Sequence, residues 1–254
     1  MKRSLLAIVI ALAFVVGNVS AAENLIYNGS FEQGSGQTAA GWSPVSPSGG
    51  NAGVAGRTAY NLSSDPGVIN WFNDYNFYES VGGENFFSVP GGESTSQVLD
   101  GTNGTREVLL TANTEYTLSV MAGWMGNSSS HYYHNLGGDN YVWHPGSLEL
   151  YADGVQLISV PLLDENGEGP AMGRWIAVKA MLSVADVNAL IAANAGLEGS
   201  ALEVRLVASG KGYDGMYGSV YNTCFDMVEL AIPEPVTMSL LAAGGLALLR
   251  RRRK

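Results

Sequence analysis

The chain has 254 residues, 33 of them glycine and only one cysteine, and it carries 23 acidic against 13 basic side chains. Residues 22–235 hold all 23 acidic residues but only six basic ones, which gives this part a formal net charge of −17. Such a charge repels nucleic acid and anionic lipid, and a single cysteine excludes an internal disulfide.

The first 22 residues have the pattern of a secretory signal peptide. Lys2 and Arg3 give a positive start, an apolar run of twelve residues follows from Leu5 to Val16, and small residues at 19–22 offer a cleavage site. Twelve residues span only about 18 Å as a helix, less than the roughly 30 Å of a bilayer core. We therefore predict that residues 1–22 direct export through the inner membrane and are then removed.

Short strand patterns follow along residues 23–230. NLIYNGSFEQ (24–33) predicts a short strand with a turn at Asn28-Gly29, and weaker strand signals lie around 54–60 and 86–89. Clearer runs, in which apolar and polar residues alternate, are STSQVLDG, EYTLSVMAGW, SLELYADGVQLISV, RWIAVKAMLSV, ALEVRLVASG and CFDMVEL. We expect about eight strands, with Asp153-Gly154 as a hairpin turn and Cys224 as a small buried residue.

One helix interrupts the strands at SVADVNALIAANAG. Ser183 is a good N-cap, Asp186 at the third helical position completes a capping pair, and Gly196 is a C-terminal stop. The apolar residues of this segment recur at helical spacing. We expect a short helix that covers an edge of the sandwich.

Three parts of the body resemble the galactose-binding-like jelly roll, a fold shared by carbohydrate-binding modules. They are the opening LIYNGSFEQ…GW, the middle SQVLDG…LTANTEYTLSVMAG and the closing FDMVEL. The resemblance implies an all-β fold, a single jelly-roll β-sandwich over residues 23–230 with one short helix. It also implies that the first and last strands lie together and hold a structural calcium ion.

Glu32 and Asp226 would be the carboxylate ligands of that calcium ion. Backbone carbonyls near Asn28 and Gly29 would have to complete the six to eight oxygens that calcium needs. The alternative is that Glu32 caps a turn and Asp226 is a solvated strand residue.

Two aromatic segments are candidates for ligand binding. Aromatic faces stack on the apolar faces of sugar rings, so we expect a platform for a neutral glycan in residues 70–80 and 131–144. Its rings would be Trp71, Tyr75, Tyr78 and Trp143. The alternative is that these rings pack on the sandwich. The second segment also holds all three histidines, although their spacing predicts a metal site only weakly.

The chain ends in IPEPVTMSLLAAGGLALLRRRRK, which resembles the PEP-CTERM sorting signal of Gram-negative bacteria. Pro-Glu-Pro, a short apolar run at 236–249 and a basic end occur in the order of that signal. The residues that carry the resemblance are Pro233, Glu234, Pro235, Arg250, Arg251, Arg252 and Arg253. It implies a transient transmembrane helix, removal of the tail by an exosortase, and delivery to the cell surface or extracellular matrix. An ordinary single-pass anchor is the alternative.

No catalytic motif stands out in the body. The chain has no Gly-x-Ser-x-Gly, and the spacing of its carboxylates favours no pair for glycoside hydrolysis. We therefore assign no catalytic residue and predict a protein that is not an enzyme, a surface or matrix module that binds extracellular polysaccharide. The alternative is a polysaccharide hydrolase or lyase with its site in segments 70–80 and 131–144.

Overall fold

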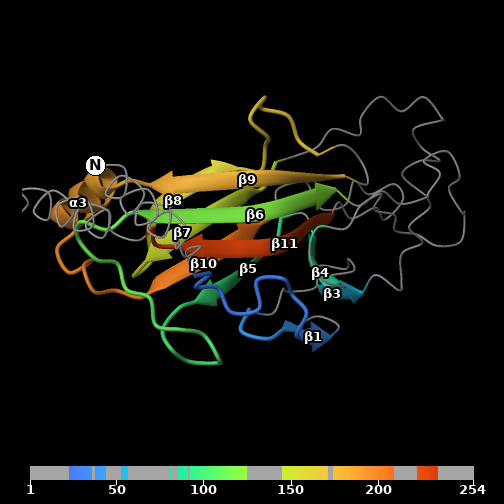
Figure 1. Cartoon of the computed structure of the whole chain (residues 1–254), viewed down its shortest axis with the longest axis horizontal. Coiled ribbons are helices and arrows are strands. Elements are labelled where there is room, and N and C mark those ends of the chain that lie inside the picture. The colour runs from blue at the N-terminus through green and yellow to red at the C-terminus, as the bar shows by residue number, and fades with distance from the viewer. Residues whose placement is uncertain are drawn as a thin grey trace, which may run out of the picture. The chain divides into compact units, whose positions relative to one another are not determined.

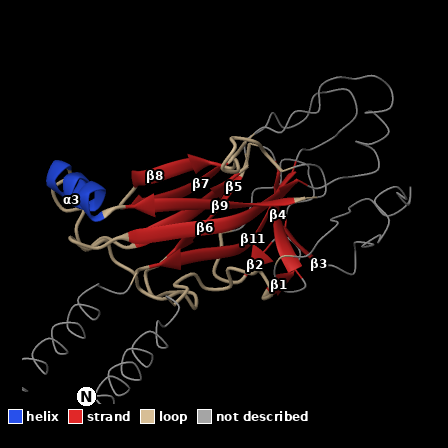
Figure 2. Ribbon diagram, turned by 45° about the horizontal axis from the view of Figure 1, so that its top comes forward, coloured by secondary structure: helices blue, strands red, loops and turns tan. Residues whose placement is uncertain are grey.

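The computed structural model describes residues 23–35, 38–43, 53–56, 81, 85–90, 92–124, 145–170, 174–208 and 222–233. Residues 24–230 form one compact unit, in which two antiparallel sheets pack against each other and a helix lies at one end (Figures 1 and 2). The predicted all-β sandwich with one short helix is confirmed.

The first sheet has four strands, in the order β5-β10-β7-β8. They are β5 (Ser94–Val98), β10 (Leu202–Val207), β7 (Ser147–Ala152) and β8 (Val155–Pro161). Burial alternates along β7 and β10, so one face of the sheet is in the core and the other faces outward. Asp153 and Gly154 both have positive φ, 46° and 74°, as the predicted tight hairpin turn between β7 and β8 requires.

The second sheet has five strands, in the order β3-β4-β11-β6-β9. They are β3 (Gly53–Gly56), β4 (Asn85–Pro90), β11 (Asn222–Ala231), β6 (Tyr116–Trp124) and β9 (Trp175–Leu182). The strand that comes last in the sequence is thus a central strand, between β4 and β6. A small hairpin of β1 (Gly34–Ser35) and β2 (Thr38–Ala39) precedes them.

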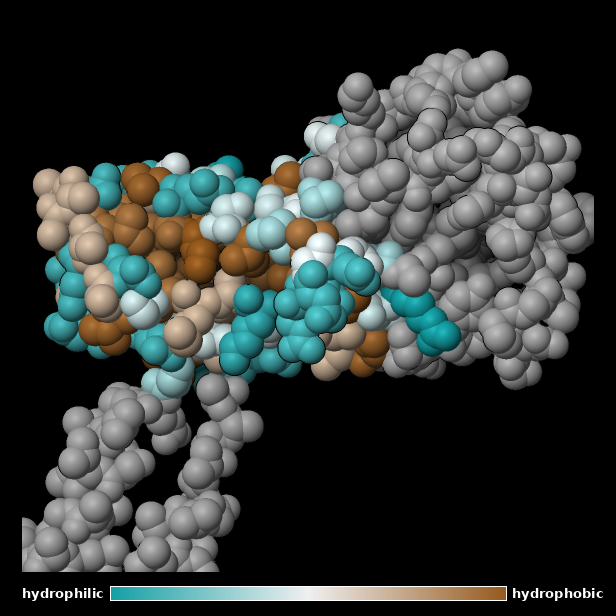
Figure 3. All heavy atoms as spheres, turned by 90° about the horizontal axis from the view of Figure 1, so that it is seen from above, coloured by the Kyte–Doolittle hydropathy of each residue, from teal (hydrophilic) through white to brown (hydrophobic). Residues whose placement is uncertain are grey.

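The core lies between the two sheets. Phe31 is fully buried there and stacks on Phe87, with ring centroids 5.3 Å apart. Trp42 also packs against Phe31, with ring centroids 5.2 Å apart. Figure 3 views the sandwich from the side of β8 and β9, where apolar side chains are visible between the rims of the two sheets.

The helix α3 (Val184–Ala193) begins where the sequence predicts. Asp186 N–H donates to the Ser183 hydroxyl, and the Asp186 carboxylate accepts from the Ser183 backbone, so both halves of the capping box are present. Val187 is fully buried in the core. The helix is fixed to the β5–β6 connection by Asn188, whose Oδ1 accepts from Asn113 N–H at 2.9 Å.

The expected strand over residues 24–33 is wrong. Asn28 and Phe31 take positive φ values of 51° and 55°, which no continuous strand tolerates, and the segment turns instead. It still lies along the last strand, because Leu25 N–H donates to Leu230 O at 2.8 Å. The adjacency of the first and last segments is therefore confirmed. Buried Gln97 fixes the middle of the segment by bonding both the N–H and the C=O of Tyr27, at 2.9 and 2.8 Å.

Several predicted segments lie outside the described residues. They are the signal peptide (1–22), the apolar run (236–249), and the sorting residues Glu234, Pro235 and Arg250–Arg253. Within the residues that the structure describes, no helix is long and apolar enough to cross a membrane.

Candidate functional site

Side chains on the outer face of the five-stranded sheet form the first candidate site. Phe87 in β4 belongs to the core, so Phe86 and Ser88 on either side of it point outward. In β11 the same alternation turns Cys224 outward, directly opposite Ser88 in the register. Phe86, Ser88 and Cys224 are nevertheless only 5%, 2% and 0% exposed. This part of the outer face is shielded from water, unlike the solvated face of an ordinary antiparallel sheet.

Trp175 in β9 lies on the same outer face, because Ile176 and Val178 pack toward the core. The rings of Phe86 and Trp175 meet edge to face, with centroids 5.8 Å apart. Strands β11 and β6 lie between β4 and β9, which in a flat sheet would place the two backbones about 14 Å apart. The two side chains therefore lean toward each other over β11 and β6. We call the surface of Phe86, Ser88, Trp175 and Cys224 the aromatic face.

A buried carboxylate adjoins the aromatic face. Phe225 pairs with Phe87, so the next residue, Asp226, comes opposite Phe86 if the register continues by one pair. Asp226 is only 2% exposed, and its Oδ1 accepts from the N–H of Met227 at 2.7 Å. Met227 has a φ of 49°, which interrupts the alternation and returns Val228 to the core. Burying a carboxylate is unfavourable unless bonds or a cation compensate its charge.

Glu32 belongs to the N-terminal segment and lies beside the start of β4. Its Oε1 accepts from the N–H of Asn85 at 2.9 Å, and its Oε2 accepts from the Asn85 side-chain amide at 3.4 Å. Because Asn85 precedes Phe86 and Asp226 follows Phe225, the register brings both predicted calcium ligands to the same part of β4 and β11.

The donor set around these carboxylates suits a hard cation only in part. Gly29 O accepts one N–H, from Val228 at 2.9 Å, which leaves a lone pair for a metal. Asn28 O already accepts from Phe31 N–H and from the indole N–H of Trp42, at 3.1 and 3.3 Å. Among the described residues, no group of three or more His, Cys, Asp or Glu side chains could hold a metal. The assignment of Glu32 and Asp226 as calcium ligands stays a prediction.

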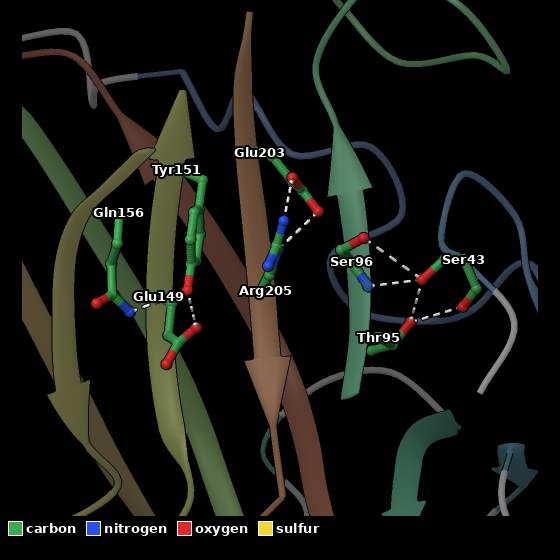
Figure 4. Close-up of polar contacts among 8 residues, drawn as sticks. All are labelled: Ser43, Thr95, Ser96, Glu149, Tyr151, Gln156, Glu203 and Arg205. Carbon is green, nitrogen blue, oxygen red and sulfur yellow. Dashed lines mark hydrogen bonds and ion pairs between the residues drawn. The ribbon is translucent and has the colours of Figure 1, made fainter. Parts of the chain in front are cut away.

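The outer face of the four-stranded sheet carries a second cluster, which we call the polar network (Figure 4). It comprises Glu149, Tyr151, Gln156, Glu203 and Arg205. Arg205 binds Glu203 through two parallel hydrogen bonds of 2.8 and 2.9 Å, and its guanidinium lies 3.9 Å from the centre of the Tyr151 ring. The Tyr151 hydroxyl donates to Glu149 at 3.0 Å and accepts from Gln156 at 3.0 Å.

The surroundings of the polar network keep Glu203 charged and Tyr151 neutral. Hydrogen bonds from Arg205 hold the pKa of Glu203 below its ordinary value, and burial, assisted by Glu149, raises the pKa of Tyr151. Each charged group thus has a partner within the network, which ties β7, β8 and β10 together. We interpret it as structural.

The edge of the four-stranded sheet is protected beside the polar network. Ser43 N–H donates to Ser96 O at 2.8 Å, and Ser96 N–H donates back to the Ser43 hydroxyl at 2.8 Å (Figure 4). Thr95 adds a bond from its hydroxyl to Ser43 O at 2.7 Å. These bonds cover part of the outer edge of β5, which would otherwise offer unpaired backbone groups to another strand.

The sequence did not single out Phe86 or Trp175. A usable signal was present in NFFSVP, because two consecutive phenylalanines in a strand must point to opposite faces, so one of them lies outside the core. The ligand residues that the sequence did predict, Trp71, Tyr75, Tyr78 and Trp143, all lie outside the described residues.

Residues 22–231 match a family model named HpiC1-like and described as HpiC1 cyclase. Among the curated proteins, none matches the chain. An apo-form cyclase from Fischerella sp. has the same fold, with 20% identity, 84% of this chain and 96% of that chain covered, and a TM-score of 0.53.

Two further structures are similar at lower scores. A cyclase from Fischerella sp. TAU shares 18% identity over 85% of this chain and 98% of that one, with a TM-score of 0.49. A cyclase from the same source in complex with 4-(1H-indol-3-yl)butan-2-one shares 18% identity over 84% and 98%, with a TM-score of 0.48.

The match to a cyclase family overturns the functional expectation drawn from the sequence. The prediction of a non-catalytic, polysaccharide-binding matrix module is wrong, and so is the prediction that the protein is not an enzyme. The alternative of a polysaccharide hydrolase or lyase is equally unsupported. The physical reason is that carbohydrate-binding modules and this family share a jelly roll, so strand patterns identify the fold but not the chemistry.

Proposed function

Because the chain belongs to the HpiC1-like family, we propose that it is an enzyme that closes a ring in a small, unsaturated, apolar molecule. The observation that carries the proposal is the contact of Phe86 with Trp175 over β11 and β6. In this proposal the substrate binds against the aromatic face.

The chemistry of ring closure suits such a surface. When an unsaturated carbon attacks an activated centre, positive charge develops on carbon, and the faces of Phe and Trp rings stabilise a nearby cation by about 0.5–2 kcal/mol. Phe86, Ser88 and Cys224 are shielded from water, so reacting carbons held beside them would be shielded as well. The strongly acidic body favours neutral or cationic substrates over anionic ones.

We expect Trp175→Leu to lower the rate of cyclisation about 2- to 30-fold while the protein stays folded, because one stabilising ring is lost. The assay incubates the protein with aromatic compounds that carry an unsaturated side chain. Ring closure by isomerisation leaves the mass unchanged and shifts the chromatographic retention, so mass-resolved chromatography detects it.

Met181→Ala is the matched control for that variant. Met181 lies on the same strand and the same outer face, is 55% exposed, and belongs to no part of the aromatic face. The Met181→Ala variant should cyclise the substrate at the same rate as the unaltered protein. Equal rates for the Trp175 and Met181 variants would remove the aromatic face from the proposal, and an absence of any isomer across the panel would contradict the activity itself.

We also propose that Asp226 and Glu32, with the carbonyl of Gly29, hold a structural calcium ion. The support is that Asp226 is a buried carboxylate next to Phe225, which pairs with Phe87, that Glu32 binds Asn85 at the start of the same strand, and that Gly29 O is bonded to Val228. Oxygen donors of these types are those that calcium prefers. The ion would offset the charge of Asp226 and fix the segment of Glu32 to β4 and β11.

Calcium should therefore raise the melting temperature of the protein. A ligand that binds only the folded state adds about 2.7 kcal/mol to the free energy of unfolding at a hundredfold excess over its Kd. Asp226→Ala and Glu32→Gln should each remove this increase, as measured by calorimetry with calcium or with chelator. Glu229→Gln, at an exposed position of the same strand, should keep it. Identical melting curves of the unaltered protein in calcium and in chelator would contradict the site.

The resemblance of the two termini to sorting segments supports a further proposal, that the protein is exported and its tail is removed by an exosortase. The mature form would then reside at the cell surface or in the extracellular matrix. A signal-like start at 1–22 and the order Pro-Glu-Pro, apolar run and basic end are the observations behind it.

We expect residues 236–254 to be absent from the mature protein. Mass spectrometry of the surface and medium fractions should recover the tryptic peptide of residues 180–205 but no peptide from the tail. The control is the membrane fraction, where an unprocessed precursor should yield both. Tail peptides in proportion to the body peptide in the medium would rule out processing.

A further inference from the structure

The two ends of the folded body are joined by a set of hydrogen bonds that we call the terminal latch. It consists of residues 24, 25 and 29 with residues 228 and 230. Leu25 N–H donates to Leu230 O at 2.8 Å, and Val228 N–H donates to Gly29 O at 2.9 Å. The Asn24 side chain donates to Val228 O at 3.0 Å and accepts from Leu230 N–H at 3.2 Å.

The latch joins the start of the body to a central strand. β11 lies between β4 and β6, and both Val228 and Leu230 are fully buried. The latch can therefore close only when the end of β11 is in place. Asn24 supplies two of the bonds, so the first residues of the body become fixed only when the last strand is in place.

The direction of the latch also decides where the ends of the body emerge. Leu25 and Leu230 face each other in antiparallel sense, so two steps further outward residue 23 comes opposite residue 232. The predicted signal peptide ends at residue 22 and the predicted tail begins at 231. Both segments thus start within a few residues of a single point on the body.

We infer that the terminal latch lets the body finish folding while both terminal segments are still attached and held at one membrane. This inference rests on the proposed export. If the two ends lay at opposite poles of the body, the terminal segments would have to bridge the length of a nine-residue strand such as β6, about 30 Å, to reach one membrane. Adjacent ends require no such extension. The body can therefore fold before either segment is removed.

The test uses the full chain, residues 1–254, purified in detergent micelles with both terminal segments in place. In the variant E23C/I232C the two new thiols should face each other at a distance that a disulfide bridges. Mild oxidation should convert most of the protein to an intramolecular disulfide, seen as a reducible shift in gel mobility. The native Cys224 is fully buried and is common to all variants.

The matched control is E23C/N166C. Asn166 is exposed, a few residues after the end of β8 (Val155–Pro161), and β8 ends at the opposite end of the sandwich from β11 (Figures 1 and 2). This pair should stay reduced. Asn24→Ala should raise the hydrogen-exchange rate of the Leu230 amide at least tenfold in the full chain, and Asn166→Ala should leave it unchanged.

Two results would overturn the inference. One is a folded full chain in which the thiols at 23 and 232 remain reduced, which would mean that the latch is open. The other is a body that melts cooperatively only after proteolytic removal of a terminal segment, which would reverse the order of folding and processing. Neither readout depends on export, so a failure of export would show only in the mass of the mature form.

Discussion

Replacement of Gly29 by alanine is expected to lower the free energy of unfolding by about 3–5 kcal/mol. A Cβ on Gly29 would overlap the carbonyl oxygen of Val228, so the two backbones of the latch could not approach as they do. To relieve the overlap the chain would have to separate from β11. The bond from Val228 to Gly29 would then be lost, and that from Asn24 to Val228 would be weakened.

Urea unfolding measures this effect, with Gly154→Ala as the control. Gly154 has a positive φ of 74° but no atom near its missing side chain, so alanine there should cost only about 1 kcal/mol through backbone strain. If both variants lost the same stability, close backbone contact at Gly29 would not be what requires glycine.

Phe31→Ala should be the most destabilising change in the core, by about 3–5 kcal/mol. Phe31 is fully buried and packs on Phe87 and Trp42, with ring centroids 5.3 and 5.2 Å away, so it holds the turning N-terminal segment against β4 and the loop of Trp42. Its removal would leave a cavity at the place where that segment, β4 and the loop of Trp42 meet.

A second variant distinguishes lost volume from a general disturbance of the segment. Phe31→Leu keeps most of the apolar volume and the same backbone conformation, so it should cost about 1–2 kcal/mol. Unfolding by urea gives both values from the same fit. A loss below about 1 kcal/mol for Phe31→Ala would show that the surroundings collapse into the space and that Phe31 does not organise the core.

The two outer faces of the sandwich differ in a way that bears on the proposed activity. On the four-stranded sheet, Arg205 pairs with Glu203 and the Tyr151 hydroxyl donates to Glu149, so the outer face is polar and partly exposed. On the five-stranded sheet, Phe86 and Cys224 are buried although they point away from the core. Only the second face can keep water from a reacting apolar molecule, which is why we place the substrate there.

Local signals in the sequence determined most of the regular structure. Alternation with a period of two predicted the strands from β5 onward, Asp153-Gly154 predicted the hairpin between β7 and β8, and Ser183 with Asp186 predicted the start of α3. Each of these depends on residues a few positions apart. The strand expected in the N-terminal segment is wrong, because positive φ at Asn28 and Phe31 is not visible in a run that otherwise alternates.

Only the tertiary structure decided the contacts between residues far apart in the chain. Phe86 and Trp175 meet because β11 and β6 take their places between β4 and β9 in one sheet, and no periodicity tells which strands become neighbours. The latch between residues 24–29 and β11 is of the same kind. The activity of the protein could be predicted neither from strand patterns nor from composition, since one jelly roll serves binding modules and cyclases alike. A functional site depends on which side chains the fold brings onto one face.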